Sequence, residues 1–112
     1  MTEEFAARLS GLLERSRPTL GRQHRLTFGS VFGASGAYVD GHIFASSGGF
    51  GVALKLPPPT RTALLGEDGA VPLRYFPKGH IKRESVVLPT RILEDRERFG
   101  ELVDASVAYV LG

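Results

Sequence analysis

The sequence contains no cysteine among its 112 residues, which excludes disulfide bonds, thiolate nucleophiles and cysteine-ligated zinc sites. It also contains no asparagine, so it has no acceptor for N-linked glycosylation. No apolar run approaches the roughly 20 residues that a membrane-spanning helix requires. Near the start, Glu3, Glu4 and Arg8 interrupt the apolar residues that a signal peptide would need. These absences predict a cytoplasmic protein without a membrane partner.

The length and composition are those of one ordinary globular domain, which we expect to span residues 1–112. Hydrophobic residues make up 42% of the chain and charged residues 23%, which is enough apolar material for a modest core. The formal net charge is +2 and the pI is about 9.3. This mildly basic balance permits contact with nucleic acid but does not require it.

Apolar residues at helical spacing predict a helix near each end of the chain, over about 3–15 and about 95–111. A third, short helix is expected over 60–65, entered through Pro59 and closed by Gly66.

The dipeptide Asp40-Gly41 lies between alternating apolar residues and predicts a β-hairpin, because a type I′ turn needs positive φ at both central positions. We expect residues 37–39 to pair with 42–46 across it. A strand over 27–31 precedes this hairpin, and Gly33 and Gly36 are expected to interrupt it.

Three further strands are predicted over about 50–56, 71–76 and 82–88. In the first of them, Phe50, Val52 and the following even-numbered residues face one way, which is typical of a half-buried antiparallel strand. Consecutive strands without alternating helices indicate an α+β fold with a single antiparallel β-sheet flanked by helices. The predicted order is a helix, three or four strands, a helix, two strands and a helix.

Several short segments occur together in a characteristic order over about residues 26–110. They are Phe32-Gly33, Gly36, Tyr38-Val39-Asp40-Gly41, Phe44-Ala45, Val52-Ala53-Leu54-Lys55, Val71-Pro72-Leu73, Tyr75, Lys78-Gly79, Leu88-Pro89 and Ile92-Leu93-Glu94-Asp95. This set resembles the N-terminal domain family of TfoX, the bacterial competence regulators. The resemblance implies the element order α-β-β-β-α-β-β-α, with one antiparallel sheet covered by helices. It also implies a role in transcription regulation as a partner of a cyclic-AMP-responsive activator.

The chain departs from this family pattern in three places. Ala34 stands where the family usually has a second glycine, and residues 83–87 replace a Met-Ser-Tyr-Tyr-like run. The second, C-terminal domain of the full-length regulators has no counterpart, so we expect a stand-alone domain. The family carries no established catalytic residues, and none are transferred to this chain.

No arrangement of residues points to catalysis, a metal or a cofactor. His24, His42 and His80 fit no metal-binding spacing. The glycines between 29 and 36 lack the Gly-Lys-Ser/Thr ending of a phosphate-binding loop, and the chain has no Gly-x-Ser-x-Gly nucleophile elbow. We therefore expect a non-enzymatic protein without a cofactor or a metal.

Basic residues gather in two segments that are candidates for phosphate contact. The tentative nucleic-acid-binding residues are Arg15, Arg17, Arg22, Arg25, Lys78, Lys82 and Arg83. Solvated loops are the alternative interpretation of both segments, and no aromatic residues interleave with the arginines of the 15–25 connector.

Phe32, Tyr38 and Phe76 are candidates for an exposed apolar patch, with burial in the core as the alternative for each. If several stay exposed together, a protein interface follows. The leading hypothesis is a regulatory or adaptor domain that acts by contact with a transcription activator or another protein, and a homodimer stays open. The alternatives are nucleic-acid binding through the 15–25 connector and a small-ligand or catalytic pocket between sheet and helices.

Overall fold

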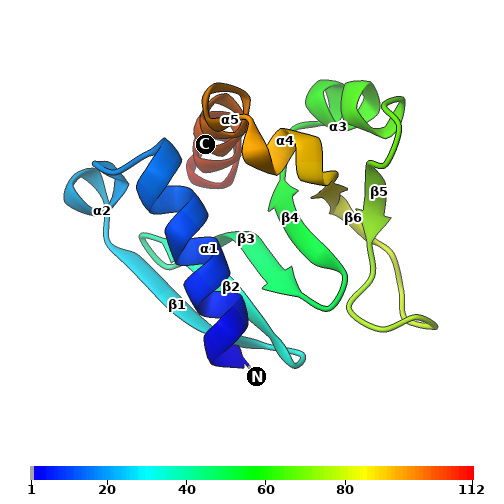
Figure 1. The fold of residues 1–112 in the computed structure, drawn as a ribbon, viewed down its shortest axis with the longest axis horizontal. Helices are drawn as coiled ribbons and strands as arrows, with labels where there is room; N and C mark the ends of the chain where they lie inside the picture. The colour runs from blue at the N-terminus through cyan, green and yellow to red at the C-terminus, as the bar shows by residue number, and fades with distance from the viewer. Residues whose placement is uncertain (1) are drawn as a thin grey trace.

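The computed structural model describes residues 2–112, which form a six-stranded antiparallel sheet and five helices (Figure 1). The strands lie in the order β1-β2-β3-β4-β6-β5. The elements are α1 (Thr2–Ser16), α2 (Leu20–Gln23), β1 (Leu26–Val31), β2 (Ala34–Val39), β3 (His42–Gly48), β4 (Gly51–Lys55), α3 (Pro58–Leu65), β5 (Val71–Leu73), β6 (Lys82–Leu88), α4 (Thr90–Glu94) and α5 (Arg96–Leu111). The predicted α+β class with one antiparallel sheet is confirmed.

The two long helices pack against each other and against the middle of the sheet. Helix α1 contacts β2 and β3, and α5 contacts β3 and β4. Helix α1 has Glu3 and Glu4 in its first turn, where carboxylates interact favourably with the helix dipole. Helix α5 begins after Asp95, whose side chain accepts a hydrogen bond from the Arg98 backbone N–H at 3.1 Å. The helices predicted over 3–15 and 95–111 are thus confirmed.

The predicted turn at Asp40-Gly41 is confirmed, since φ is 50° at Asp40 and 86° at Gly41. A second turn of the same kind joins β1 to β2, with φ of 47° at Phe32 and 80° at Gly33. The prediction that Gly36 interrupts the strand is wrong. Gly36 lies inside β2 and is paired on both sides, because the turn at Gly33 had already reversed the chain.

A β-bulge sits in the centre of the sheet, between β2 and β3. Ala37 pairs with Ala45 and Tyr38 with Ile43, so Phe44 is the extra residue. The bulge lets the neighbouring residues Phe44 and Ala45 both enter the main core. The hydroxyl of Ser106 on α5 donates a hydrogen bond to the Phe44 carbonyl at 3.0 Å.

Other differences from the predicted elements are local. The helices α2 and α4 were not expected, because four or five residues make little more than one turn and show no apolar repeat. The strand predicted over 71–76 ends at Leu73. The short helix predicted over 60–65 begins earlier, at Pro58, because proline fits the first turn of a helix.

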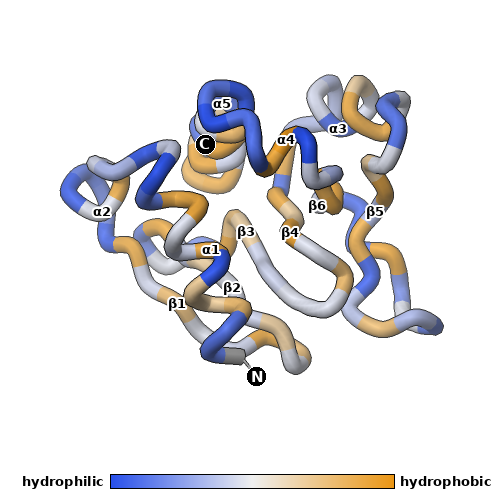
Figure 2. Tube along the Cα trace, viewed as in Figure 1, coloured by the Kyte–Doolittle hydropathy of each residue, from blue (hydrophilic) through white to orange (hydrophobic). Residues whose placement is uncertain are grey.

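The main core lies between the sheet and the helices. Its largest fully buried side chains include Leu9, Phe44, Leu54 and Phe99. Figure 2 shows hydrophilic stretches at α2 and at the start of α5, on the outside of this layer. No helix within residues 2–112 combines the length and the apolar character needed to cross a bilayer.

A second, smaller cluster is built from strand and turn residues alone, on the side of the sheet that faces away from the main core. It contains Ala53, Leu73 and Val87, with Phe50 and Tyr75 packed against them. Paired residues on antiparallel strands share a face, and the pairs that join Ser46 to Ala53 and Ala53 to Val87 continue this surface across three strands. We call this side, with its row of Ser46, Ala53 and Val87, the open face.

The open face corrects two expectations about β4. Phe50 does not face the same way as Val52, because Phe50 belongs to the turn before the strand and packs on the open face. Ala53 is only 1% exposed, so β4 is buried on both faces rather than half-buried.

Candidate functional site

Four aromatic rings form a continuous row at the open face. The ring centroids of Phe50 and Tyr75 are 5.6 Å apart, those of Tyr75 and Phe32 are 5.3 Å apart, and those of Phe32 and Phe76 are 6.2 Å apart. The rings come from the β1–β2 turn, the β3–β4 turn and the segment after β5. Phe32 is 59% exposed and Phe76 55% exposed. The expectation that both contribute to an exposed apolar patch is confirmed.

Two adjoining hollows of about 180 and 200 Å³ lie beside this row of rings. Phe32, Tyr75 and Lys82 line both of them, so the hollows share a wall. The first also reaches the small side chains of Ser46 and Ala53, which leave room that larger residues would fill. We call the two hollows together the aromatic groove.

Lysines stand beside the rings. The ammonium group of Lys82 lies 5.5 Å from the centroid of Phe32, within the range of a cation–π contact. Lys55, from the end of β4, lines the first hollow, and His80 lines the second. The aromatic groove therefore combines apolar walls with positive charge.

Tyr38, the third predicted member of the patch, is half-buried on the same face but outside the aromatic groove. A Cβ placed on Gly36 would come within 3.3 Å of the Tyr38 ring and 2.8 Å of the Ile43 side chain, so the glycine allows both to lie flat on the sheet. Tyr38 lines an adjoining depression with Glu84 and Tyr109, and Lys55 lines both this depression and the first hollow. Glu84 accepts a hydrogen bond from the Tyr109 hydroxyl, and this bond raises the pKa of Tyr109.

The two basic segments lie at opposite edges of the sheet. The 15–25 connector leads into β1, while Lys78, Lys82 and Arg83 lie in and after the β5–β6 connection (Figure 1). Of these last three, Lys82 lines the aromatic groove, and Lys78 and Arg83 are exposed.

Within the connector, two of the four arginines already have partners. Arg17 donates two hydrogen bonds of 2.8 Å to the Asp104 carboxylate, and this pairing raises the pKa of Arg17. Arg15 donates to the Leu93 carbonyl at 3.4 Å. Arg22 and Arg25 are exposed.

Asp40 ties the connector to the β2–β3 hairpin. Its carboxylate accepts hydrogen bonds of 2.8 Å from the Arg25 backbone N–H and from the ring of His24, and these bonds, the backbone one first, lower the pKa of Asp40. His42 is the first residue of β3, and His80 lies in the loop between β5 and β6. Across residues 2–112, no three histidine, aspartate or glutamate side chains are grouped as a metal site would require.

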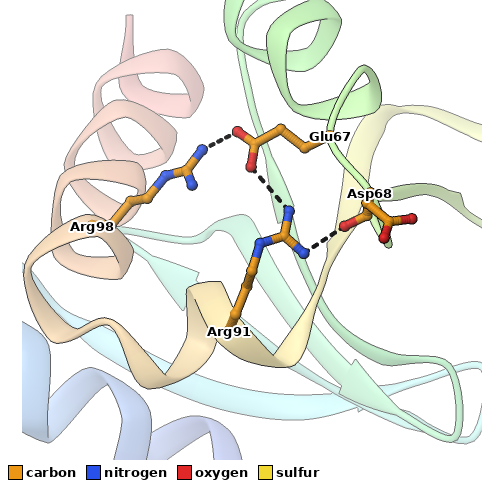
Figure 3. Close-up of polar contacts among 4 residues, drawn as sticks. All are labelled: Glu67, Asp68, Arg91 and Arg98. Atoms are coloured by element: carbon orange, nitrogen blue, oxygen red, sulfur yellow. Dashed lines mark hydrogen bonds and ion pairs between the residues drawn. The ribbon is translucent and has the colours of Figure 1, made fainter.

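An ion-pair network secures the loop that leads into β5, as Figure 3 shows. Glu67 accepts hydrogen bonds from Arg98 on α5 and from Arg91 on α4, and Arg91 also donates to the Asp68 carbonyl at 2.6 Å. The hydrogen bond from Arg98 is the main cause of a lowered pKa at Glu67. By fixing residues 67–68 to the helices, the network fixes the start of the segment that carries Tyr75 and Phe76.

Comparisons of the chain with protein-family models, with curated proteins and with solved structures found no match. The resemblance to the TfoX N-terminal domain family therefore stays a prediction.

Sequence reasoning missed three residues of this surface, namely Phe50, Lys55 and Tyr75. Phe50 and Tyr75 were assigned to predicted strands because they continued the apolar alternation of those strands. Lys55 was interpreted as a solvent-facing residue of the predicted half-buried strand over 50–56. The small residues at 46 and 53 carried a usable signal, because small side chains in mid-strand leave a hollow that neighbouring rings surround.

Proposed function

We propose that this chain is a non-enzymatic regulatory or adaptor domain that acts by protein–protein contact, with the aromatic groove as its contact surface. The observation that carries the proposal is the pair of largely exposed phenylalanines, Phe32 and Phe76, gathered around Tyr75 from separate segments. Clustered exposed aromatic side chains are typical of the centres of protein interfaces, where such residues supply much of the binding energy. A role in transcription regulation is supported by the resemblance to the TfoX N-terminal domain family.

The small size of each hollow favours a protein partner over a metabolite. Sites for small molecules usually enclose about 300–1,000 Å³, whereas the two hollows measure about 180 and 200 Å³. Each hollow suits a single apolar side chain that projects from a partner's surface. The alternative of a small-ligand or catalytic pocket would need the two hollows to act as one site, because each alone is below this range.

Nucleic-acid binding through the 15–25 connector is the competing proposal. The Arg17 guanidinium is bound by Asp104, which reduces the positive charge that the connector presents to phosphates. Three remaining arginines that each neutralised one phosphate of duplex DNA would give a slope of log K against log salt of about −2.7. We expect that the chain does not bind duplex DNA even at low salt, so that no such slope is measured.

Capture of partners from the host organism tests the proposal. The doubly substituted chain Phe32→Ala/Phe76→Ala is compared with the unaltered chain and with Phe28→Ala. Phe28 is a matched control, because its ring is 37% exposed and lies near α1 rather than on the open face. Circular dichroism establishes that each variant is folded.

We expect at least one protein to be recovered with the unaltered chain and with Phe28→Ala but lost with the double variant. Recovery of only the bait from the host, or equal recovery with all three chains, contradicts the proposal.

A further inference from the structure

The charged residues that line the aromatic groove, Lys55 and Lys82, are both positive. Residues 70–83, which contain β5 and reach the start of β6, include four of the chain's 14 Lys and Arg residues and none of its 12 Asp and Glu residues. The basic residues of this segment are Arg74, Lys78, Lys82 and Arg83, with His80 between them. The chain as a whole is nearly balanced at +2, so this excess is local.

The cations of the aromatic groove differ from the arginines elsewhere in the fold. Within the part of the chain that the structure describes, the ion pairs involve Arg17, His24, Arg91 and Arg98, none of which lines the groove. Glu84, the first acidic residue after this segment, bonds to Tyr109 and lines the adjoining depression, which Lys55 also lines, but no ion pair within residues 2–112 joins it to Lys55. Lys55 and Lys82 are therefore placed to meet carboxylates that a partner supplies.

We propose that the occupant of the aromatic groove is an acidic segment of a partner protein, in which apolar side chains are flanked by Asp or Glu. One apolar side chain enters each hollow, and the flanking carboxylates approach Lys55 and Lys82. This inference rests on the proposed function and adds the chemistry of the partner. Complementary charge at the rim of an apolar contact raises the association rate and excludes basic partners.

A single-stranded nucleic acid is the alternative occupant, because it also combines negative charge with flat apolar groups, namely its bases. Its bases need exposed ring faces as stacking platforms. Here neighbouring rings are inclined to one another, with interplanar angles of 87° for Phe50 and Tyr75, 54° for Phe32 and Tyr75 and 68° for Phe32 and Phe76, so they do not present a series of parallel faces. The hollows between tilted rings suit side chains better than a run of stacked bases.

Fluorescence anisotropy of labelled probes with the full chain tests the inference. Three short peptides share one length. The first carries two phenylalanines among Asp, Glu and Ser residues, the second replaces the acids by lysine, and the third replaces the phenylalanines by serine. An oligothymidylate is the fourth probe. We expect the acidic phenylalanine peptide to bind about ten-fold more tightly than each of the other three probes, and salt to weaken it.

Charge reversal locates the contact. Lys82→Glu should weaken the acidic phenylalanine peptide about five-fold or more and strengthen its lysine counterpart. Arg22→Glu makes the same change of charge at an exposed site at the opposite edge of the sheet, and it should leave both affinities within about two-fold. Equal effects of the two substitutions, or tighter binding of the oligothymidylate, would overturn the inference.

The outcomes separate this inference from the proposed function. If the lysine peptide binds as well as the acidic one and Phe32→Ala weakens both, the aromatic groove is a protein-binding surface but its partner is not acidic. If Phe32→Ala changes no peptide's affinity and host capture is also unaffected, both proposals fail.

Discussion

Removal of one buried hydroxyl tests how the centre of the sheet is held. Ser106 is fully buried on α5, and its hydroxyl donates to the carbonyl of Phe44, the extra residue of the β-bulge. A bulged residue leaves the regular ladder, so its carbonyl depends on a donor from outside the strands. We predict that Ser106→Ala destabilises the protein, although alanine is the better helix former.

The magnitude follows from two opposing contributions. A buried carbonyl that loses its donor costs about 1–3 kcal/mol of unfolding free energy. The higher helix propensity of alanine returns about 0.5 kcal/mol. The expected net loss is about 0.5–2.5 kcal/mol, which for a domain of this size lowers the melting temperature by several degrees.

Urea unfolding followed by circular dichroism measures this loss as a lower midpoint with an unchanged slope. Ser10→Ala is the control, because Ser10 is exposed on α1 and contributes only the propensity difference. The control should leave the unfolding free energy unchanged or raise it slightly. If Ser106→Ala is as stable as Ser10→Ala, the hydroxyl does not stabilise the bulge and the reasoning is wrong.

Two further predictions concern the parts of the fold that support the aromatic groove. Arg98 lowers the pKa of Glu67 below its ordinary value of 4.5, so Glu67 adds stability above that pH and loses it as the pH falls through the lowered pKa. When unfolding is measured from pH 7 to pH 3, the free energy of unfolding of Glu67→Gln should be lower than that of the unaltered chain at neutral pH. This difference should shrink in acid, and a difference that grows in acid would refute the assignment. A Cβ on Gly48 would lie 2.6 Å from the Phe50 ring, so Gly48→Ala should cost about 1–3 kcal/mol, whereas Gly49→Ala, with open space around it, should be near neutral.

The elements that could be predicted from the sequence are those that depend on residues close together in the chain. The turn at Asp40-Gly41 needs positive φ at two adjacent positions. Because few dipeptides tolerate this, the sequence predicted the hairpin. The two long helices could be predicted because their apolar residues recur at helical spacing over several turns. Helices α2 and α4 are too short to show an apolar repeat. The turn at Phe32-Gly33 was missed because phenylalanine rarely adopts positive φ.

The aromatic groove was only half predictable, because it depends on which face of the sheet the helices leave uncovered. Phe32 and Phe76 were recognised as candidates for an exposed patch, but nothing local in the sequence placed them next to Tyr75, which follows β5. Phe50 was assigned to the wrong face, since the alternation of β4 seemed to include it. Contacts among distant segments are set by strand order, which a single sequence does not reveal.

Site-specific photocrosslinking in the host tests the central claim, namely that the open face is the contact surface. The photoreactive residue p-benzoylphenylalanine replaces Phe76 in one chain and Phe28 in another, both being exposed aromatic positions. The account predicts a covalent adduct with another protein from position 76 and none from position 28. An adduct from position 28 alone, or from neither position, would contradict it.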